Sequence, residues 1–153
     1  MAKSRNAYKQ GFFNPIHPKK YVGTHPIVYR SGLELNVMRF FDENSSVITW
    51  GSESIVIPYV KPTTGRVHKY YTDFVVSIKD NSGKIHRYVI EVKPYRQTIP
   101  PTAGKRKKQK TIITEQIAWA VNSSKWDSAK KWCDKNGFKF TILTEKDIEK
   151  YIR

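Results

Sequence analysis

Two acidic residues stand inside stretches that otherwise predict β-strands, and they are the first candidates for chemistry. Asp73 lies within residues 69–78, and Glu91 lies within residues 85–93. A carboxylate in a strand core is unfavourable unless it has a partner. If the two strands are antiparallel neighbours, Asp73 and Glu91 come side by side. Their repulsion is then relieved when a divalent cation joins them.

Two further residues, Lys93 and Glu34, extend this pair into a possible catalytic set. Glu91 and Lys93 are two apart, so both side chains point to one face of a strand. A lysine there can orient a water molecule or stabilise charge on a phosphate. Glu34, on an expected upstream helix, is a third carboxylate for a hard cation such as Mg²⁺, which prefers oxygen ligands.

This set of residue types suits a metal-dependent phosphodiesterase. In such an enzyme a metal lowers the pKa of a bound water, which attacks phosphorus in line with the leaving alkoxide. The alternative for Glu91-Val92-Lys93 alone is a surface salt bridge on a two-faced strand. The additional carboxylates of Asp73 and Glu34, in a chain of net charge +15, favour the catalytic interpretation.

The elements that would position these residues follow from hydrophobic spacing and turn residues. Ser31 with Glu34 three residues later is a capping-box pattern, and it predicts the start of a helix. The strands at 69–78 and 85–93 are joined by a turn at 80–83 and predict an antiparallel hairpin. The first helix is expected to end at 44–46, and further strands are expected at 47–50, 55–59 and 138–143. Two more helices are expected at 111–121 and 125–135, separated by an interruption at Asn122 or Ser123. Thr144 is expected to cap a short last helix. This order predicts an α/β fold with a mixed central β-sheet flanked by helices.

Length and charge define the class of protein and its partner. The chain has 153 residues, which fits one domain, and its single cysteine excludes an internal disulfide framework. No apolar run is long enough for a membrane span. Residues 1–40 contain seven basic residues against one acidic, and residues 94–110 contain six basic residues and no acidic one. Such segments favour a polyanion, most simply nucleic acid. One alternative is a basic surface that only keeps the chain soluble. Another is a module that binds nucleic acid without cleaving it, which would explain the charge but not the carboxylates in the strands.

The two basic segments have different expected roles. Residues 1–26 contain three prolines and predict an extended basic N-terminal arm laid over the body or partly disordered, with the catalytic domain at 27–153. The loop after Lys93 is expected to contact DNA phosphates through Arg96, Lys105, Arg106, Lys107, Lys108 and Lys110.

The spacing of Asp73 and Glu91-Val92-Lys93, preceded by a helix glutamate, resembles the PD-(D/E)xK nuclease superfamily. The longer stretches resemble the head completion nucleases of T-even-type phages, which are similar to TnsA-type transposon endonucleases. These stretches include residues 27–34, 50–53, 57–59, 70–74, 90–94 and 142–146. Two positions depart from the pattern: Thr72 stands where the superfamily often has proline, and Glu91 stands where the transposon enzyme has glutamine.

The resemblance implies a restriction-endonuclease-like core and a Mg²⁺-dependent (or Mn²⁺-dependent) DNA endonuclease. It implies Asp73 as the central metal ligand, Glu91 as the second and Glu34 as an additional one, with Lys93 positioning the attacking water. It also implies action on packaged double-stranded DNA during head completion, before neck and tail attachment. The expected partners are phage head or portal-neck proteins, and the expected locations are the host cytoplasm during assembly and the virion head-neck. The alternative is a non-catalytic, DNA-end-binding structural protein of the head-neck.

Overall fold

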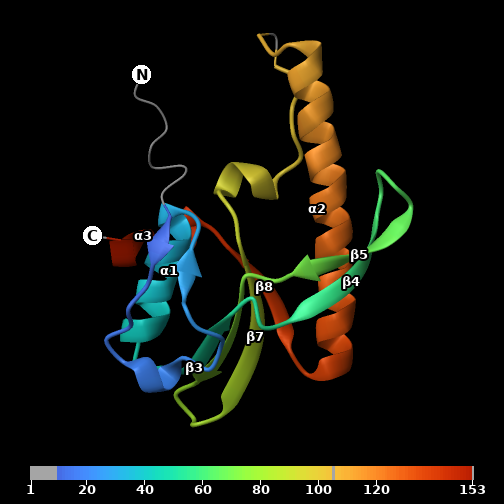
Figure 1. Ribbon diagram of the computed structural model, residues 1–153. Helices are drawn as coiled ribbons and strands as arrows, with labels where there is room; N and C mark the ends of the chain where they lie inside the picture. The colour runs from blue at the N-terminus through green and yellow to red at the C-terminus, as the bar shows by residue number, and fades with distance from the viewer. Residues whose placement is uncertain (1–9, 105, 153) are drawn as a thin grey trace.

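A four-stranded mixed sheet forms the centre of the structure (Figure 1). The computed structural model describes residues 10–104 and 106–152. The strand order is β3-β6-β7-β8, with β3 at Val47–Ser52, β6 at Phe74–Lys79, β7 at Ile85–Val92 and β8 at Lys139–Leu143. The β3–β6 and β6–β7 pairs are antiparallel, and β7–β8 is parallel. The predicted mixed sheet and the predicted β6–β7 hairpin are confirmed.

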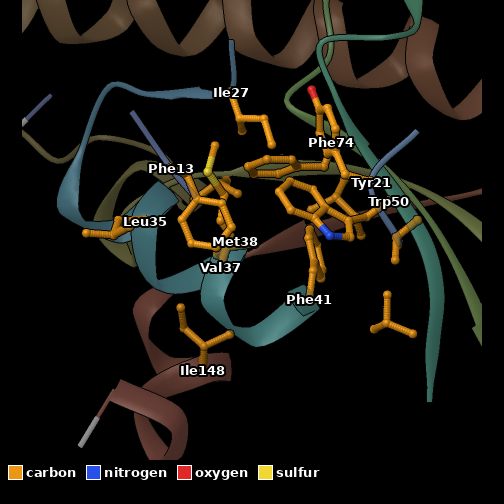
Figure 2. Packing of buried hydrophobic residues seen from close by; sticks show 14 residues of the cluster. Phe13, Tyr21, Ile27, Leu35, Val37, Met38, Phe41, Trp50, Phe74 and Ile148 are labelled. Carbon is orange, nitrogen blue, oxygen red and sulfur yellow. The ribbon is translucent and has the colours of Figure 1, made fainter. Parts of the chain in front are cut away.

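One face of this sheet is covered by α1 (Gly32–Glu43) and α3 (Glu145–Ile152), which contact each other. The apolar residues of α1 that recur at helical spacing face the sheet and form the main core (Figure 2). Trp50 on β3 is fully buried at the centre of this core. Four aromatic rings, from Phe13, Tyr21, Phe41 and Phe74, lie 4.8 to 6.1 Å from the Trp50 ring, centroid to centroid.

The opposite face carries the long helix α2 (Gln109–Asn136) and a second, two-stranded sheet. This second sheet consists of β4 (Val56–Lys61) and β5 (Arg66–Tyr71), and it projects as a hairpin beside α2 (Figure 1). The inward side chains of Ile57, Tyr59 and Tyr70 pack with Trp126 and Ala129 of α2. Helices on both faces of a mixed sheet are the predicted α/β arrangement.

Residues 10–26 are attached to the rest of the domain by strand pairing, core packing and hydrogen bonds. Strand β1 (Gly11–Phe12) pairs with β2 (Val28–Tyr29), and the short helix η2 (Pro18–Lys20) follows. Phe13 and Tyr21 from this segment belong to the main core. The carboxylate of Asp42 accepts hydrogen bonds from the backbone N–H groups of Ile16 and His17. Residues 1–9 of the expected arm lie outside the described residues.

The expected strand at 69–78 is wrong as a single element, because the chain changes sheets in its middle. β5 ends at Tyr71 and pairs with β4, whereas β6 begins at Phe74 and pairs with β3 and β7. Thr72 makes the transition: its backbone N–H and its hydroxyl both donate to the carbonyl of Ile55, at 3.1 and 2.9 Å. Both halves have β-forming residues, so the sequence pattern alone does not reveal the break.

The two helices expected at 111–121 and 125–135 are one continuous helix, α2. The polar residues at 122–124 include no proline or glycine, so they do not prevent helical backbone. Their polarity serves a contact instead: the Ser124 hydroxyl donates to the carbonyl of Val60 on β4 at 2.7 Å. The helix ends at Gly137, which caps α2 in the left-handed conformation with φ of 77°.

Candidate active site

Asp73 lies at the junction of the two sheets, opposite Glu91. The β6–β7 register pairs Phe74 with Ile90, and one further step along both strands sets Asp73 against Glu91. The Oδ2 atom of Asp73 accepts a hydrogen bond of 2.7 Å from the backbone N–H of Val92. The structure therefore brings together the two carboxylates that the sequence singled out, although Asp73 lies just before β6 and not inside a strand.

Glu91 is almost completely buried and is held from two sides. It is 5% exposed, and its Oε1 atom accepts a hydrogen bond of 2.6 Å from the hydroxyl of Tyr70 on β5. Its Oε2 atom lies 3.6 Å from Nζ of Lys93. Lys93 follows β7 directly, and its backbone N–H donates to the carbonyl of Leu143 at 3.0 Å. The parallel pairing with β8 thus fixes the backbone from which Lys93 extends.

The electrostatics of the pair show an excess of negative charge. Burial raises the pKa of Asp73 well above its usual range, and the charges of Glu91 and Glu34 raise it further. The hydrogen bond from Val92 and the charge of Lys93 act in the opposite direction. Burial and the neighbouring Glu91 carboxylate also raise the pKa of Tyr70, which keeps its hydroxyl protonated as a donor. A cation at this position would relieve the repulsion.

Glu34 lies in the first turn of α1, where Ser31 caps the helix by accepting the Glu34 N–H at 3.1 Å. Its Oε1 atom accepts a hydrogen bond of 2.8 Å from the backbone N–H of Arg30. Burial raises the pKa of Glu34; contacts with Arg30 lower it, and the charges of Glu53 and Glu91 raise it. Glu34 is thus electrostatically coupled to the Asp73–Glu91 pair. Within residues 10–104 and 106–152, however, no three histidine, cysteine or acidic side chains converge as a preformed metal cluster.

Glu53 and Arg30 form an ion pair beside this site. Glu53 follows β3 and has a left-handed backbone with φ of 53°, which is uncommon for a residue other than glycine. Its backbone N–H donates to the carbonyl of Asp73 at 2.9 Å. This bond fixes the main chain of Asp73, while Val92 fixes its side chain.

The donor set fits a divalent hard cation. Asp73 and Glu91 lie opposite each other in the hairpin register, and burial and the charge of Glu91 raise the pKa of Asp73. Hard cations prefer such oxygen ligands. Asp73 and Glu91 would hold the ion, with Glu34 as the nearest further carboxylate.

The basic loop expected to contact DNA starts at this site and runs away from it. Arg96 lies in η3 (Tyr95–Thr98), and the chain then continues beside α2 to its N-terminal end (Figure 1). Of the remaining expected contacts, Arg106, Lys108 and Lys110 are exposed. Lys107 is engaged within the protein, because its ammonium donates to Glu115 and to the carbonyl of Thr102, at 2.8 and 2.7 Å. Lys105 lies outside the described residues.

Two residues near the carboxylates, Tyr70 and Lys125, had no role in the sequence-based site. Tyr70 is a buried residue near the end of β5, and a buried tyrosine in a strand is usually only a core residue. Lys125 precedes the buried Trp126 in a helix where basic residues are common. Only the tertiary structure places its Nζ atom 5.4 Å from the ring centre of Tyr70 and 5.7 Å from that of Tyr59.

Comparison with known proteins identifies the family to which the chain belongs. Residues 44–145 match the family described as "TnsA-like endonuclease N terminal", and this range holds Asp73, Glu91 and Lys93. The chain is also 38% identical over 143 residues to a protein of Enterobacteria phage T4 named "Head completion nuclease", covering 88% of this chain and 90% of that protein. The mixed sheet with flanking helices fits the restriction-endonuclease-like fold expected of such a domain. The chain is therefore a nuclease that belongs to the TnsA-like endonuclease family.

Proposed function

We propose that the protein is a divalent-metal-dependent DNA endonuclease of the PD-(D/E)xK type. The observation that carries this proposal is the arrangement at the end of β7: the hairpin register sets Asp73 opposite Glu91, and the Lys93 ammonium lies 3.6 Å from Glu91. A structural salt bridge requires only Glu91 and Lys93. It does not account for a second, poorly compensated carboxylate directly opposite.

The reaction is hydrolysis of a phosphodiester bond. A bound Mg²⁺ or Mn²⁺ would lower the pKa of water and stabilise charge on the phosphate. Lys93 orients the attacking water through its ammonium. The water gives up a proton to solvent as its oxygen forms a new bond to phosphorus, the opposite P–O bond breaks, and the leaving alkoxide takes up a proton from solvent. Tyr70 holds the buried Glu91 in place with its hydroxyl, and Val92 holds Asp73.

The biological setting follows from the phage relative and from the charge. We propose that the substrate is packaged double-stranded DNA, cut during head completion before neck and tail attachment, in contact with head or portal-neck proteins. The cell compartment would be the host cytoplasm and later the virion head-neck. Among the helices in the described part of the chain, none is long and apolar enough to cross a membrane.

Purified protein incubated with linear and circular DNA tests the activity. We expect cleavage with Mg²⁺ or Mn²⁺ and none with EDTA. Asp73→Asn and Glu91→Gln should each abolish cleavage, because they remove ionised ligands without changing shape. Asp127→Asn, at an exposed acidic residue of α2, is the matched control and should cleave normally. Cleavage in EDTA, or full cleavage by Asp73→Asn, would contradict the proposal.

A non-catalytic role in binding DNA ends is the second candidate, favoured by the exposed Arg96, Arg106 and Lys108, which are available for phosphates whether or not the site cuts. Phage that lack their own copy and are supplied with Lys93→Ala protein separate the two roles. If cleavage is essential, this protein reaches the head but yields no infectious particles. Normal yield from a variant shown to be cleavage-dead would leave the end-binding role.

A further inference from the structure

The side of the candidate site formed by α2 carries one ammonium group, that of Lys125, that the proposed mechanism does not use. Lys125 lies midway along α2, the helix that packs against β8 of the central sheet and against β4. Its Nζ atom is positioned over the rings of Tyr70 and Tyr59, at 5.4 and 5.7 Å from their centres. The Tyr70 hydroxyl in turn donates to Glu91. One tyrosine therefore separates the ammonium from the buried carboxylate.

This ammonium is half-buried and lacks a carboxylate partner. No acidic side chain of the described residues lies within salt-bridge distance of Lys125, whereas Lys93 and Lys107 each have one. Contacts with aromatic ring faces only partly replace the water that burial removes. Burial accordingly lowers the pKa of Lys125, while the charges of Glu91 and Asp73 raise it. The group is close enough to sense both carboxylates without pairing with either.

The charges around the site indicate what such a group would bind. Asp73, Glu91 and Glu34 are three acids, and Lys93, Lys125 and Lys61, whose charge also acts on Lys125, are three bases. One divalent cation at Asp73 and Glu91 would give this ionised set two positive charges in excess. A phosphodiester group, with one negative charge, would be attracted to it.

We propose that Lys125 contacts the DNA substrate directly, donating from its ammonium to a non-bridging oxygen of the phosphate at the Asp73–Glu91 site. This rests on the proposed nuclease function and adds a second cationic group on a different element from Lys93. Lys93 acts on the water, and Lys125 acts on the phosphate. The alternative is that Lys125 only packs its aliphatic stem over Tyr59 and Tyr70.

Three substitutions separate these roles. Lys125→Met keeps the stem over the tyrosine rings and removes the charge, and Lys125→Arg keeps the charge. Lys130→Met removes the same charge from an exposed position on the same helix and is the matched control. Thermal unfolding of each variant checks the fold. If Lys125→Met does not fold, Lys125→Gln is used for the same measurements.

The first measurement is DNA affinity at several salt concentrations, in Ca²⁺ and under conditions where the DNA is recovered intact. Losing one phosphate contact should reduce the slope of log affinity against log salt by about 0.9. We expect this reduction for Lys125→Met and not for Lys125→Arg or Lys130→Met. The second measurement is the single-turnover cleavage rate at saturating protein in Mg²⁺. It should fall about 100-fold for Lys125→Met, the typical effect of removing one group that stabilises developing charge.

An unchanged slope and an unchanged rate for Lys125→Met would overturn the proposal and leave the packing role. That result, together with an inactive Asp73→Asn protein, would leave the nuclease function intact. If the unmodified protein cleaves no DNA with any divalent metal, the nuclease function is rejected instead. The salt slope still decides whether Lys125 contacts phosphate, because it is measured without hydrolysis.

Discussion

Replacing Asp42 by alanine should loosen the attachment of residues 16–17 to α1 and destabilise the whole protein. Asp42 is 1% exposed, and its two carboxylate oxygens accept the backbone N–H groups of Ile16 and His17 at 2.7 and 2.9 Å. Hydrogen bonds to a charged group contribute about 1.5–3 kcal/mol each. The loss is partly offset, by about 0.5 kcal/mol, because a negative charge in the last turn of a helix is unfavourable. The expected decrease in the free energy of unfolding is therefore about 2.5–5.5 kcal/mol.

Urea denaturation at neutral pH measures this decrease, which would be a large part of the roughly 5–15 kcal/mol of a typical domain. The adjacent, exposed Glu43 provides the control: Glu43→Ala should change stability by less than about 0.5 kcal/mol. Hydrogen exchange should also become faster at the amides of Ile16 and His17. If Asp42→Ala lost less than about 1 kcal/mol and these amides stayed protected, the two hydrogen bonds would not anchor the segment.

Three further predictions concern the site and the basic loop. Lys93→Ala should lower the single-turnover cleavage rate by about 100- to 10,000-fold with little change in DNA affinity, since it acts on the reaction and not on binding; a parallel loss of affinity would argue against that role. The pKa of Asp73 is higher in the folded protein than in the unfolded chain, where it is about 3.9. In EDTA, the free energy of unfolding should therefore decrease as pH rises from about 3.9 through the pKa of the folded state. Asp73→Asn should therefore be more stable than the unmodified protein at pH 7 and equal to it below about pH 4, and Mg²⁺ should raise the melting temperature of the unmodified protein only; equal stability of the two proteins across this range would show that the repulsion is absent. Neutralising the four exposed basic groups of residues 94–110 should reduce the slope of log affinity against log salt by up to about 4, and an unchanged slope would mean that this segment does not contact phosphate; these groups are Arg96, Arg106, Lys108 and Lys110.

The sequence predicted the strand pairing of the site well because local patterns determine it. A turn at 80–83 between two β-rich runs was sufficient to predict the β6–β7 hairpin. The hairpin register then sets Asp73 opposite Glu91, and the spacing of two places Glu91 and Lys93 together. The capping pattern at Ser31 and Glu34 located the start of α1 for the same reason.

What the sequence did not predict depends on contacts between distant segments. The transition at Thr72 requires a hydrogen bond to Ile55, seventeen residues away. The continuity of α2 through Ser124 requires a partner on β4, sixty-four residues away. Thr72 also explains a departure from the superfamily pattern: a proline there has no N–H to donate to Ile55, whereas threonine donates from both its backbone and its hydroxyl. The role of Lys125 beside Tyr70 has no local signal at all.

The change of sheets at Thr72 gives this nuclease a modular construction. The β4–β5 hairpin shares no strand with the central sheet, and it is joined to the carboxylate pair through the Tyr70 hydroxyl and through the short connection at Thr72. Its outward face carries the exposed Val56, Val60 and Val67, and the tip at 62–65 is an open turn. The hairpin can therefore be lengthened or given new outward residues without disturbing the strands that hold Asp73 and Glu91. Contacts to a particular DNA or protein partner can evolve there while the cutting chemistry stays constant.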